Sequence, residues 1–337
     1  MHIGVIGSGA IGCLVAAYLK LEGEDVSLVG RADSVKAIQQ NGLQISGVRG
    51  NFKVEIKISE QLNYFPQLLI LATKTQDIEC AIKDNISLIR NTQILTIQNG
   101  VQAENIVARF LPKENIVSSI VMFGATYLEP AKLVHNFEGS WILGWPFDKK
   151  QPEGLAGLSK ILNKAFPTLV SENIVGMKFL KIFANANNCL AGILGKSMQE
   201  VFSDLDVSRI SIAIWKEGLK IIDKAGIKLV SLPGLPVENI TRLTSMPTSQ
   251  AAVVFSQIMK NLSKEPLYGS ILQSIMRGRS SEIDYINGEF IRLAEANKIT
   301  APLNSVLVDM VHKIEKEGRF YSKEKLFTSI QQVSGLE

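Results

Sequence analysis

A glycine-rich hexapeptide near the amino terminus is the first group of residues whose types and spacing suggest chemistry. It reads Gly7-Ser8-Gly9-Ala10-Ile11-Gly12, after the apolar run His2–Ile6 and at the start of the amphipathic stretch Gly12–Leu21. The first glycine permits a tight turn, the second lets the backbone approach a pyrophosphate, and the third lets helix and strand pack closely. Free N–H groups at the helix start would face the phosphate charge. A glycine-rich turn without a ligand is the alternative, but the strand, loop and helix context favours dinucleotide binding.

The end of the second expected strand, Asp25–Val29, indicates which dinucleotide is bound. An NAD site usually has an Asp or Glu there, about 20 residues beyond the glycine loop, for the ribose 2′-hydroxyl. This sequence reads Leu28-Val29-Gly30-Arg31, with no acid at the strand end. The planar guanidinium of Arg31 suits a 2′-phosphate, although an exposed loop arginine near Asp33 is the alternative. We therefore predict NADP(H) as the cofactor.

Two more loops follow expected strands and so belong at the carboxyl edge of the sheet, where ligands bind in such folds. Lys74 follows the run Leu68–Ala72, and Asn99 follows the run Ile94–Thr96. Lys74 could reach a phosphate, and Asn99 could hydrogen-bond nicotinamide, ribose or substrate. Each residue alone reads as an ordinary loop or turn residue, but the register makes both plausible ligands.

Four polar or soft side chains share one face of an expected helix, Ile174–Leu194. At about 100° per residue, with Lys181 at zero, Asn185 lies at about 40°, Asn188 at about −20° and Cys189 at about 80°. The rest of the helix is apolar, so these groups must be solvated by something. Periodicity does not decide between a plain exposed face and a face that lines a binding cleft.

A segment later in the chain, Ser281 to Gly288, is expected to begin another helix. Ser281 and Asp284 fit a capping pattern, and an apolar stripe follows them. On spacing alone, Glu282 reads as a first-turn carboxylate that complements the helix dipole.

Composition excludes several kinds of chemistry. The chain has 337 residues, 46% of them hydrophobic and 20% charged, and a net charge of +4, as in ordinary globular proteins. No Lys/Arg block indicates nucleic-acid binding. The three histidines and three cysteines lie far apart in the sequence, which argues against a metal site, a disulfide framework and a histidine-based triad. Any catalysis must therefore use other groups.

The chain is expected to have two domains. In the first half, short apolar runs alternate with amphipathic stretches, which predicts βαβ units and a parallel sheet. Hairpin-like patterns around residues 116–127 and 133–143 predict later strands that extend the sheet, with antiparallel pairing open to them. Helical periodicity replaces strand runs after about residue 170. The predicted fold class is α/β: a Rossmann-type dinucleotide-binding domain with a parallel-sheet core (residues 1–170), then an all-helical substrate and dimerisation domain (residues 171–330).

No targeting signal or membrane span is recognisable in the sequence. The first residues lack a basic n-region and a long apolar stretch, and the apolar runs are shorter than the roughly 20 residues that a span needs. We predict a cytoplasmic protein without nucleic-acid or membrane partners, and a homodimer is one assembly that the apolar helical domain would suit.

Taken together, these residues resemble the ketopantoate reductases (2-dehydropantoate 2-reductases), and the resemblance covers nearly the whole chain. It is carried by Gly7 to Gly12, Arg31, Thr73-Lys74, Gln98-Asn99-Gly100, Lys181-Ile-Phe-Ala-Asn185, Ser270, Glu282-Ile-Asp-Tyr-Ile-Asn-Gly288 and Pro302-Leu-Asn304. The segment from Glu282 to Gly288 is the most specific of these.

The resemblance implies NADPH-dependent reduction of a 2-oxo acid to a 2-hydroxy acid in a cleft between two domains. By that resemblance, Arg31 and Lys74 would bind the 2′-phosphate and Asn99 would lie beside nicotinamide and substrate. Lys181 would be the general acid that protonates the carbonyl oxygen. Asn185, Ser270 and Glu282 would then hold the carboxylate and hydroxyl groups of the substrate.

One departure bears on the substrate. The family often has a second asparagine four residues beyond Asn185, where this chain has Cys189. Our hypothesis is that Asn188, on the same helix face, supplies the missing amide. Ketopantoate is therefore the first expected substrate, another 2-oxo acid is the rival, and a non-catalytic NADP-sensing protein is a third alternative.

Overall fold

The chain forms two compact units, Met1–Val175 and Gly176–Glu337. The computed structural model describes residues 1–147, 152–263 and 265–334. The division falls within the first turn of the helix Ile174–Ala186, whereas the sequence analysis placed it after residue 170.

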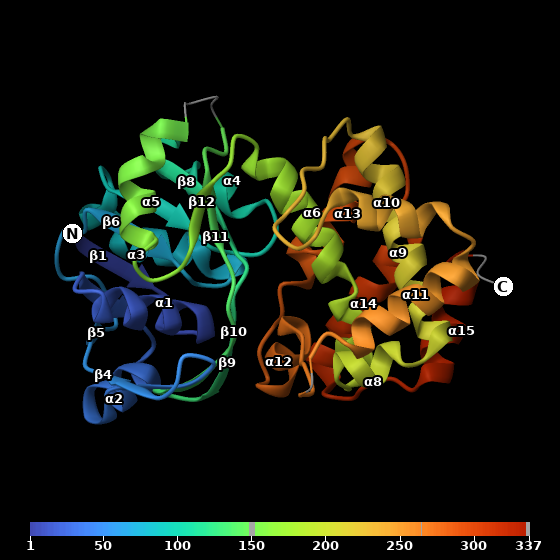
Figure 1. The fold of residues 1–337 in the computed structure, drawn as a ribbon, viewed down its shortest axis with the longest axis horizontal. Helices are drawn as coiled ribbons and strands as arrows, with labels where there is room; N and C mark the ends of the chain where they lie inside the picture. Colours follow the sequence, from blue (N-terminus) through green and yellow to red (C-terminus); the bar gives the residue numbers. More distant parts are fainter. Residues whose placement is uncertain (148–151, 264, 335–337) are drawn as a thin grey trace. The chain divides into compact units, whose positions relative to one another are not determined.

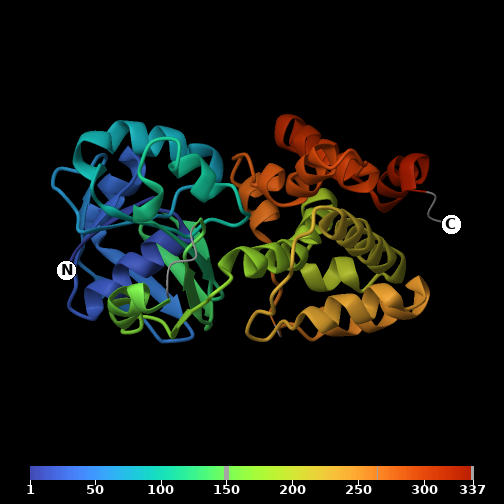
Figure 2. The same ribbon diagram turned by 90° about the horizontal axis from the view of Figure 1, so that it is seen from above.

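An eight-stranded sheet lies at the centre of the first unit (Figures 1 and 2). Among the described residues its order is β12-β11-β8-β7-β6-β1-β2-β5, and every neighbouring pair is parallel except β8 with β11. The strands are β1 (His2–Ile6), β2 (Asp25–Val29), β5 (Lys57–Ser59), β6 (Leu68–Leu71), β7 (Gln93–Thr96), β8 (Ile116–Val121), β11 (Trp141–Gly144) and β12 (Thr168–Val170). The predicted parallel core is confirmed, and the pairing of β8 with β11 is the antiparallel one that the sequence left open. Chain order reverses between β1 and β6, which is where ligands bind in sheets of this kind.

Helices cover both faces of this sheet. On one face α1 (Ala10–Leu21) and α5 (Ala156–Leu162) share a buried apolar cluster with the strands. On the other face α3 (Ile78–Ile89) and α4 (Ala103–Val107) do the same. Because the central strands are buried on both sides, they read in the sequence as continuous apolar runs rather than as alternating ones.

A separate four-stranded sheet in this unit corrects one prediction. Its order is β4-β3-β10-β9, formed by β3 (Leu43–Gly47), β4 (Phe52–Val54), β9 (Gly124–Glu129) and β10 (Lys132–Phe137). Part of the predicted hairpin region therefore pairs away from the main sheet. It packs on α1, where the Tyr18 hydroxyl lies 3.1 Å from Nδ1 of the buried His135. A short edge strand such as β4 carries too weak a period-2 pattern to be recognised alone.

The second unit is mostly helical in its described residues, with loops and one isolated β-bridge between Leu232 and Leu235. Its helices are α6 (Ile174–Ala186, which begins just before the unit boundary), α7 (Asn188–Leu194), α8 (Met198–Phe202), α9 (Leu205–Lys224), α10 (Val237–Ser245), α11 (Thr248–Lys260), α12 (Ser270–Met276), α13 (Asn287–Ala296), α14 (Pro302–Glu317) and α15 (Lys323–Ser334). The expected all-helical region is confirmed. The helix predicted over 174–194 is wrong in one respect, because it is interrupted at Asn187 and forms two helices.

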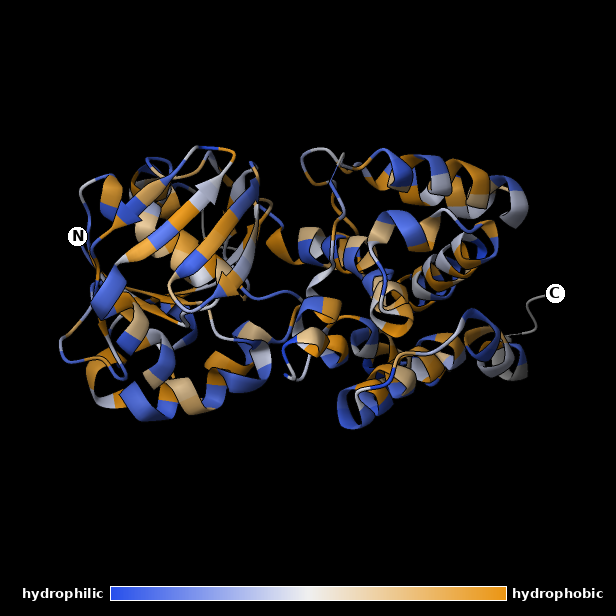
Figure 3. Cartoon of the chain, turned by 90° about the horizontal axis from the view of Figure 1, so that it is seen from below, coloured by the Kyte–Doolittle hydropathy of each residue, from blue (hydrophilic) through white to orange (hydrophobic). Residues whose placement is uncertain are grey.

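Aromatic contacts hold the centre of this unit together. Trp215 on α9 donates its indole N–H to the Phe183 carbonyl at 2.8 Å and meets Phe255 edge-on at 5.3 Å. Phe183 also meets Phe290 of α13 at 5.1 Å. Each helix carries both apolar and polar residues along its length (Figure 3), as expected for helices that pack one face inwards. No helix of the described residues is long and apolar enough to cross a membrane.

Candidate active site

The glycine loop has the geometry that its sequence predicts. Gly7 has φ of +118°, and a Cβ there would lie 2.5 Å from the Ala72 backbone carbon. A Cβ at Gly12 would lie 1.9 Å from the Gly7 oxygen, so α1 and β1 pack as closely as they do only because both residues are glycine. Around Gly9, by contrast, no described atom lies within 4 Å of the Cβ position, which leaves open space in front of the helix.

The start of α1 faces this open space with unsatisfied N–H groups. Its N-cap is Gly9, and no described side chain caps it. The first turn of a helix attracts anions through those N–H groups and the helix dipole. Ser8 reaches across to Gly30, where a Cβ would lie 2.4 Å from the Ser8 Oγ. Gly30 is a residue that the sequence analysis did not single out; its position at a strand end beside a glycine loop was the available signal.

Two cations follow β2 and β6 at the same edge of the sheet. Arg31 is the N-cap of α2 (Ala32–Asn41), and Lys74 is the N-cap of the 3-10 helix η1 (Thr75–Asp77). The exposed Arg31 guanidinium lies 3.7 Å from the Asp77 carboxylate, which draws the two loops together. An exposed pair of this kind contributes little to stability, so Arg31 stays available to an anion.

Asn99 lies at the neighbouring strand end, and Gln98 holds its loop. The Gln98 amide donates to the Leu71 carbonyl at 2.8 Å and to the Thr73 carbonyl at 3.0 Å. The remaining Gln98 oxygen and the Thr73 hydroxyl are buried, and within the described part of the chain neither has a hydrogen-bond partner. Buried polar atoms without partners are rare, and two of those in the described residues lie at the edge predicted to receive a cofactor.

Lys181 is a half-buried lysine on α6 whose pKa is displaced towards neutrality. Burial lowers the pKa of Lys181 from 10.5 to about 8; the positive charge of Lys178 lowers it further, and the carboxylate of Glu282 opposes this. Lys178 lies one helical turn before Lys181 and is 3% exposed. A lysine with such a pKa can hold or release a proton near neutral pH. The sequence analysis did not single out Lys178, although its spacing was visible.

The helix face predicted around Lys181 is correct for the asparagines and wrong for Cys189. Asn185 and Asn188 are partly exposed like Lys181, but Cys189 is fully buried. The Cys189 sulfur accepts a hydrogen bond from the Asn287 amide at 3.7 Å, and burial raises the pKa of its thiol to about 12. At about 80° from Lys181, Cys189 lies at the edge of the predicted face, and there it contacts Asn287 of α13 instead of solvent.

Asn188 lies beside the start of α12, where Ser270 is the first residue. A Cβ at Gly269 would come within 3.2 Å of the Asn188 Cβ and Cγ, so the Asn188 side chain packs directly against the residue that precedes Ser270. Ser270 is exposed. The structure thus brings these two predicted substrate residues to one place.

Glu282 lies in a non-helical segment, which corrects the predicted helix start. The segment forms a 3-10 turn, η4 (Ile283–Tyr285), and α13 begins only at Asn287. The Ser281 N–H donates to a Glu315 carboxylate oxygen at 2.7 Å, so α14 fixes the segment just before Glu282. Glu282 is therefore not a first-turn dipole residue, and its charge reaches Lys181.

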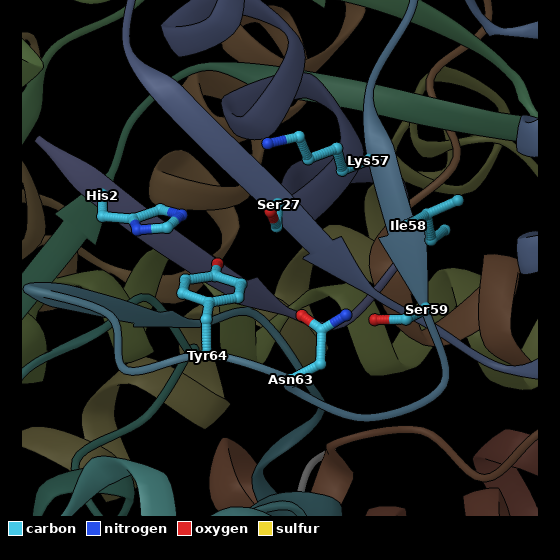
Figure 4. Close-up of a pocket in the computed structure, with 7 residues that line it drawn as sticks. All are labelled: His2, Ser27, Lys57, Ile58, Ser59, Asn63 and Tyr64. Carbon is cyan, nitrogen blue, oxygen red and sulfur yellow. The ribbon is translucent and has the colours of Figure 1, made fainter.

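No group of His, Cys, Asp and Glu in the described residues could hold a metal ion. A separate pocket of about 360 Å³ lies over β1, β2 and β5 (Figure 4), with His2, Lys57 and Tyr64 among its lining residues. Those groups have partners within the chain, since Asp25 lies 3.2 Å from His2 and 3.7 Å from Lys57, and Tyr64 stacks on His2. We assign this pocket no function.

Comparison with known proteins identifies the family. The family model described as Ketopantoate reductase PanE/ApbA matches residues 3–146, and its C-terminal counterpart matches residues 173–315. The chain belongs to the ketopantoate reductase family. It is accordingly an enzyme of the oxidoreductase class, as the sequence resemblance predicted. A 2-dehydropantoate 2-reductase of Pyrococcus horikoshii is 31% identical over 321 residues, which cover 94% of this chain and 99% of that relative. A second, from Pyrococcus abyssi, is 29% identical and covers 92% of this chain and 97% of that relative.

Solved structures of other proteins share the ketopantoate reductase fold. The ternary structure of D-mandelate dehydrogenase with NADH and anilino(oxo)acetate has a TM-score of 0.81 and 25% identity, over 94% of this chain and 99% of that one. A PanE/ApbA family ketopantoate reductase from Ralstonia eutropha has a TM-score of 0.78 and 23% identity over the same shares.

Proposed function

We propose that this chain reduces 2-dehydropantoate to pantoate with NADPH, with Lys181 as the general acid. The observation that carries the proposal is the pKa of about 8 at Lys181, which lies near Glu282 on a framework of the ketopantoate reductase family. The named relatives support the substrate, because two of them at 29–31% identity are 2-dehydropantoate 2-reductases.

The first unit supplies the residues that would hold a nicotinamide dinucleotide. The backbone from Gly7 through Ser8, Gly9, Ala10, Ile11 and Gly12 would receive the pyrophosphate, in the open space at Gly9 and against the start of α1. Arg31 and Lys74 would bind a 2′-phosphate, and Asn99 would lie beside the nicotinamide. The NADH complexes of D-mandelate dehydrogenase support the nicotinamide cofactor, and Arg31 in place of an acid supports NADPH.

Lys181 would hold a proton at Nζ and donate it to the carbonyl oxygen of the substrate. A bound NADPH supplies the hydride for C2, and negative charge then develops on that oxygen. An ammonium group beside it stabilises the charge and delivers the proton. Asn185, Asn188, Ser270 and Glu282 would hold the carboxylate and hydroxyl groups of the substrate.

A related 2-oxo acid is the second candidate substrate. Cys189 is buried against Asn287 and offers no group to a ligand, so the set of amides differs from the one that the family often has. D-mandelate dehydrogenase, with anilino(oxo)acetate in its ternary structure, supports a wider range of 2-oxo acids for this fold. A non-catalytic NADP sensor is disfavoured, because such a protein needs neither Lys181 nor Glu282.

The test is NADPH oxidation with 2-dehydropantoate and a panel of other 2-oxo acids. We expect kcat/KM to be highest for 2-dehydropantoate, with phenyl- and alkyl-substituted 2-oxo acids at least tenfold lower. Turnover confined to the other acids would assign the second candidate. Binding of NADPH without turnover of any acid would overturn both.

Replacing Arg31 tests the cofactor prediction. Arg31→Ala should raise the Kd for NADPH by about tenfold or more, because a charge-assisted contact to the 2′-phosphate is lost, and should barely change the Kd for NADH. Fluorescence titration with both cofactors measures the two effects. Equal losses for NADPH and NADH would contradict a 2′-phosphate contact.

Replacing Lys178 tests the electrostatics of the proposed acid. Lys178→Met removes a positive charge near Lys181, so the pKa of Lys181 should rise from about 8 towards its ordinary value. A general acid works only while protonated, so activity is lost as pH rises through its pKa. In the pH profile of kcat/KM, the fall in activity on the alkaline side should therefore move to higher pH in Lys178→Met. The exposed Lys224 gives the control, since Lys224→Met should leave that fall in place.

A further inference from the structure

The interruption between α6 and α7 leaves a backbone carbonyl for a side chain to satisfy. In a continuous helix the Leu190 N–H would donate to the Ala186 carbonyl, four residues back. It donates instead to the Asn187 carbonyl at 3.1 Å. The Ala186 carbonyl, one residue beyond Asn185, accepts a hydrogen bond from the Asn287 amide at 3.1 Å. A side chain from α13 therefore completes the end of the helix that carries Lys181.

The orientation of the Asn287 amide is fixed by a chain of hydrogen bonds that begins at a carboxylate. Glu217 of α9 can only accept, and it accepts from the Asn304 Nδ2 at 2.8 Å and from the Asn304 N–H at 2.9 Å. The Asn304 oxygen must then face Asn287, whose Nδ2 donates to it at 2.9 Å. Asn287 and Asn304 are fully buried. Glu217 thus orients the Asn304 amide, with its nitrogen towards Glu217, and the Asn304 oxygen in turn orients the nitrogen of Asn287 towards itself.

Asn287 is also the residue at which the segment that carries Glu282 joins α13. Helix α14 fixes this segment at two points, since Glu315 accepts from the Ser281 N–H at 2.7 Å and Asn304 accepts from Asn287. Glu282 lies between these two points. Asn287 is the one residue among these that contacts both α14 and the end of α6.

We propose that Asn287 is a positioning residue, which holds the Lys181 helix and the Glu282 segment at a fixed separation. Asn304 and Glu217 act through it by orienting its amide. The inference rests on the proposed function, because it concerns the distance between Lys181, the proposed acid, and Glu282, the carboxylate proposed to bind the substrate.

The proposed acid would respond to a loss of this contact. Lys178, on the same helix, and Glu282, on the segment before η4, are the charges that act on Lys181. Lys178 moves with Lys181, whereas Glu282 lies on another segment, which the contacts described above hold against α14 and the end of α6. When the Glu282 segment shifts away, the attraction between its carboxylate and the ammonium weakens with distance. The pKa of Lys181 then falls further.

Asn287→Ala tests the role of Asn287 against a matched control. Asn85 is a comparably buried asparagine on α3 whose side chain likewise ties two segments together, since it accepts from the Leu62 N–H at 2.9 Å and donates to the Ala81 carbonyl at 2.9 Å. Asn287→Ala and Asn85→Ala should both lower the melting temperature. Only Asn287→Ala should lower kcat by about tenfold or more at unchanged Kd for NADPH, because misplaced groups lose rate rather than cofactor affinity.

A second readout does not depend on turnover. The pH dependence of Lys181 acylation by acetic anhydride, followed by peptide mass spectrometry, reports the pKa of this lysine directly. We expect it to fall by about 0.5 or more in Asn287→Ala and to stay unchanged in Asn85→Ala. If Asn287→Ala does not fold, Asn304→Ala is measured in its place, with the same expected direction.

The results separate the two proposals. An unchanged pKa of Lys181 and an unchanged kcat in a folded Asn287→Ala protein would overturn the positioning role. If the wild-type protein reduces no 2-oxo acid, the proposed function fails, and the acylation profile still decides whether Asn287 controls Lys181.

Discussion

Lys181→Ala should lower kcat for 2-oxo acid reduction by about 10²–10⁴-fold and leave the Kd for NADPH unchanged. The variant removes the proposed proton donor, and general acid catalysis contributes about that much to a rate. The residues proposed to bind the cofactor lie on other elements, from Gly7 to Asn99, so the affinity for NADPH should not change. Steady-state kinetics together with NADPH fluorescence titration separate the two quantities.

Lys181→Arg distinguishes the proton from the charge. Arginine keeps a cation but holds its proton at every working pH, so it can stabilise negative charge on oxygen without acting as an acid. We expect it to recover only a small part of the lost rate, and to abolish the alkaline limb that the pKa of about 8 at Lys181 gives the wild type. Turnover of Lys181→Ala within about threefold of the wild type would remove Lys181 from the mechanism.

Alanine at Gly12 and at Gly9 should both abolish NADPH binding, for different reasons. At Gly12 the new Cβ would lie 1.9 Å from the Gly7 oxygen, so helix and strand must separate. Overpacking of this kind costs about 1–3 kcal/mol of folding free energy. At Gly9 the new Cβ meets no described atom, so folding should be unaffected, but the methyl group would occupy the space proposed for the pyrophosphate.

Calorimetry and cofactor titration test this pair together. Gly12→Ala should melt at lower temperature and bind NADPH at least 100-fold more weakly, because the phosphate site is built on the contact between α1 and β1. Gly9→Ala should melt like the wild type and lose a similar factor in affinity. Wild-type affinity in Gly9→Ala would show that the open space in front of α1 is not the cofactor site.

The sequence predicted an element best where the pattern of the element's own residues shows how it is buried. Strands buried on both faces read as apolar runs, so β1, β2, β6 and β7 were predicted close to their observed bounds. The short strands β3 and β4 were missed. β3 pairs with β10, which lies far away in the sequence, and β4 is a three-residue edge strand that pairs with β3. No local pattern records a pairing between distant segments.

The residues of the candidate site also fall into two groups, those that local spacing predicts and those that it does not. The glycine loop and the edge residues Arg31, Lys74 and Asn99 follow strands directly, so their placement could be argued from spacing. Helical periodicity correctly predicted the partial exposure of Lys181, Asn185 and Asn188. It did not predict the burial of Cys189, because Cys189 contacts Asn287, which lies 98 residues away in the sequence.

By itself, the sequence determined the two-unit organisation, the glycine loop with its cations, and the position of one lysine among apolar residues. These follow from local rules of periodicity and turn geometry. Only the tertiary structure decided the protonation of that lysine and the constraint on its helix. Burial and the charge of Lys178 lower the pKa of Lys181 to about 8, and the charge of Glu282, about one hundred residues away, opposes this. The end of its helix depends on the Asn287 amide. Charges and hydrogen bonds act over distances in space, which a linear pattern does not contain.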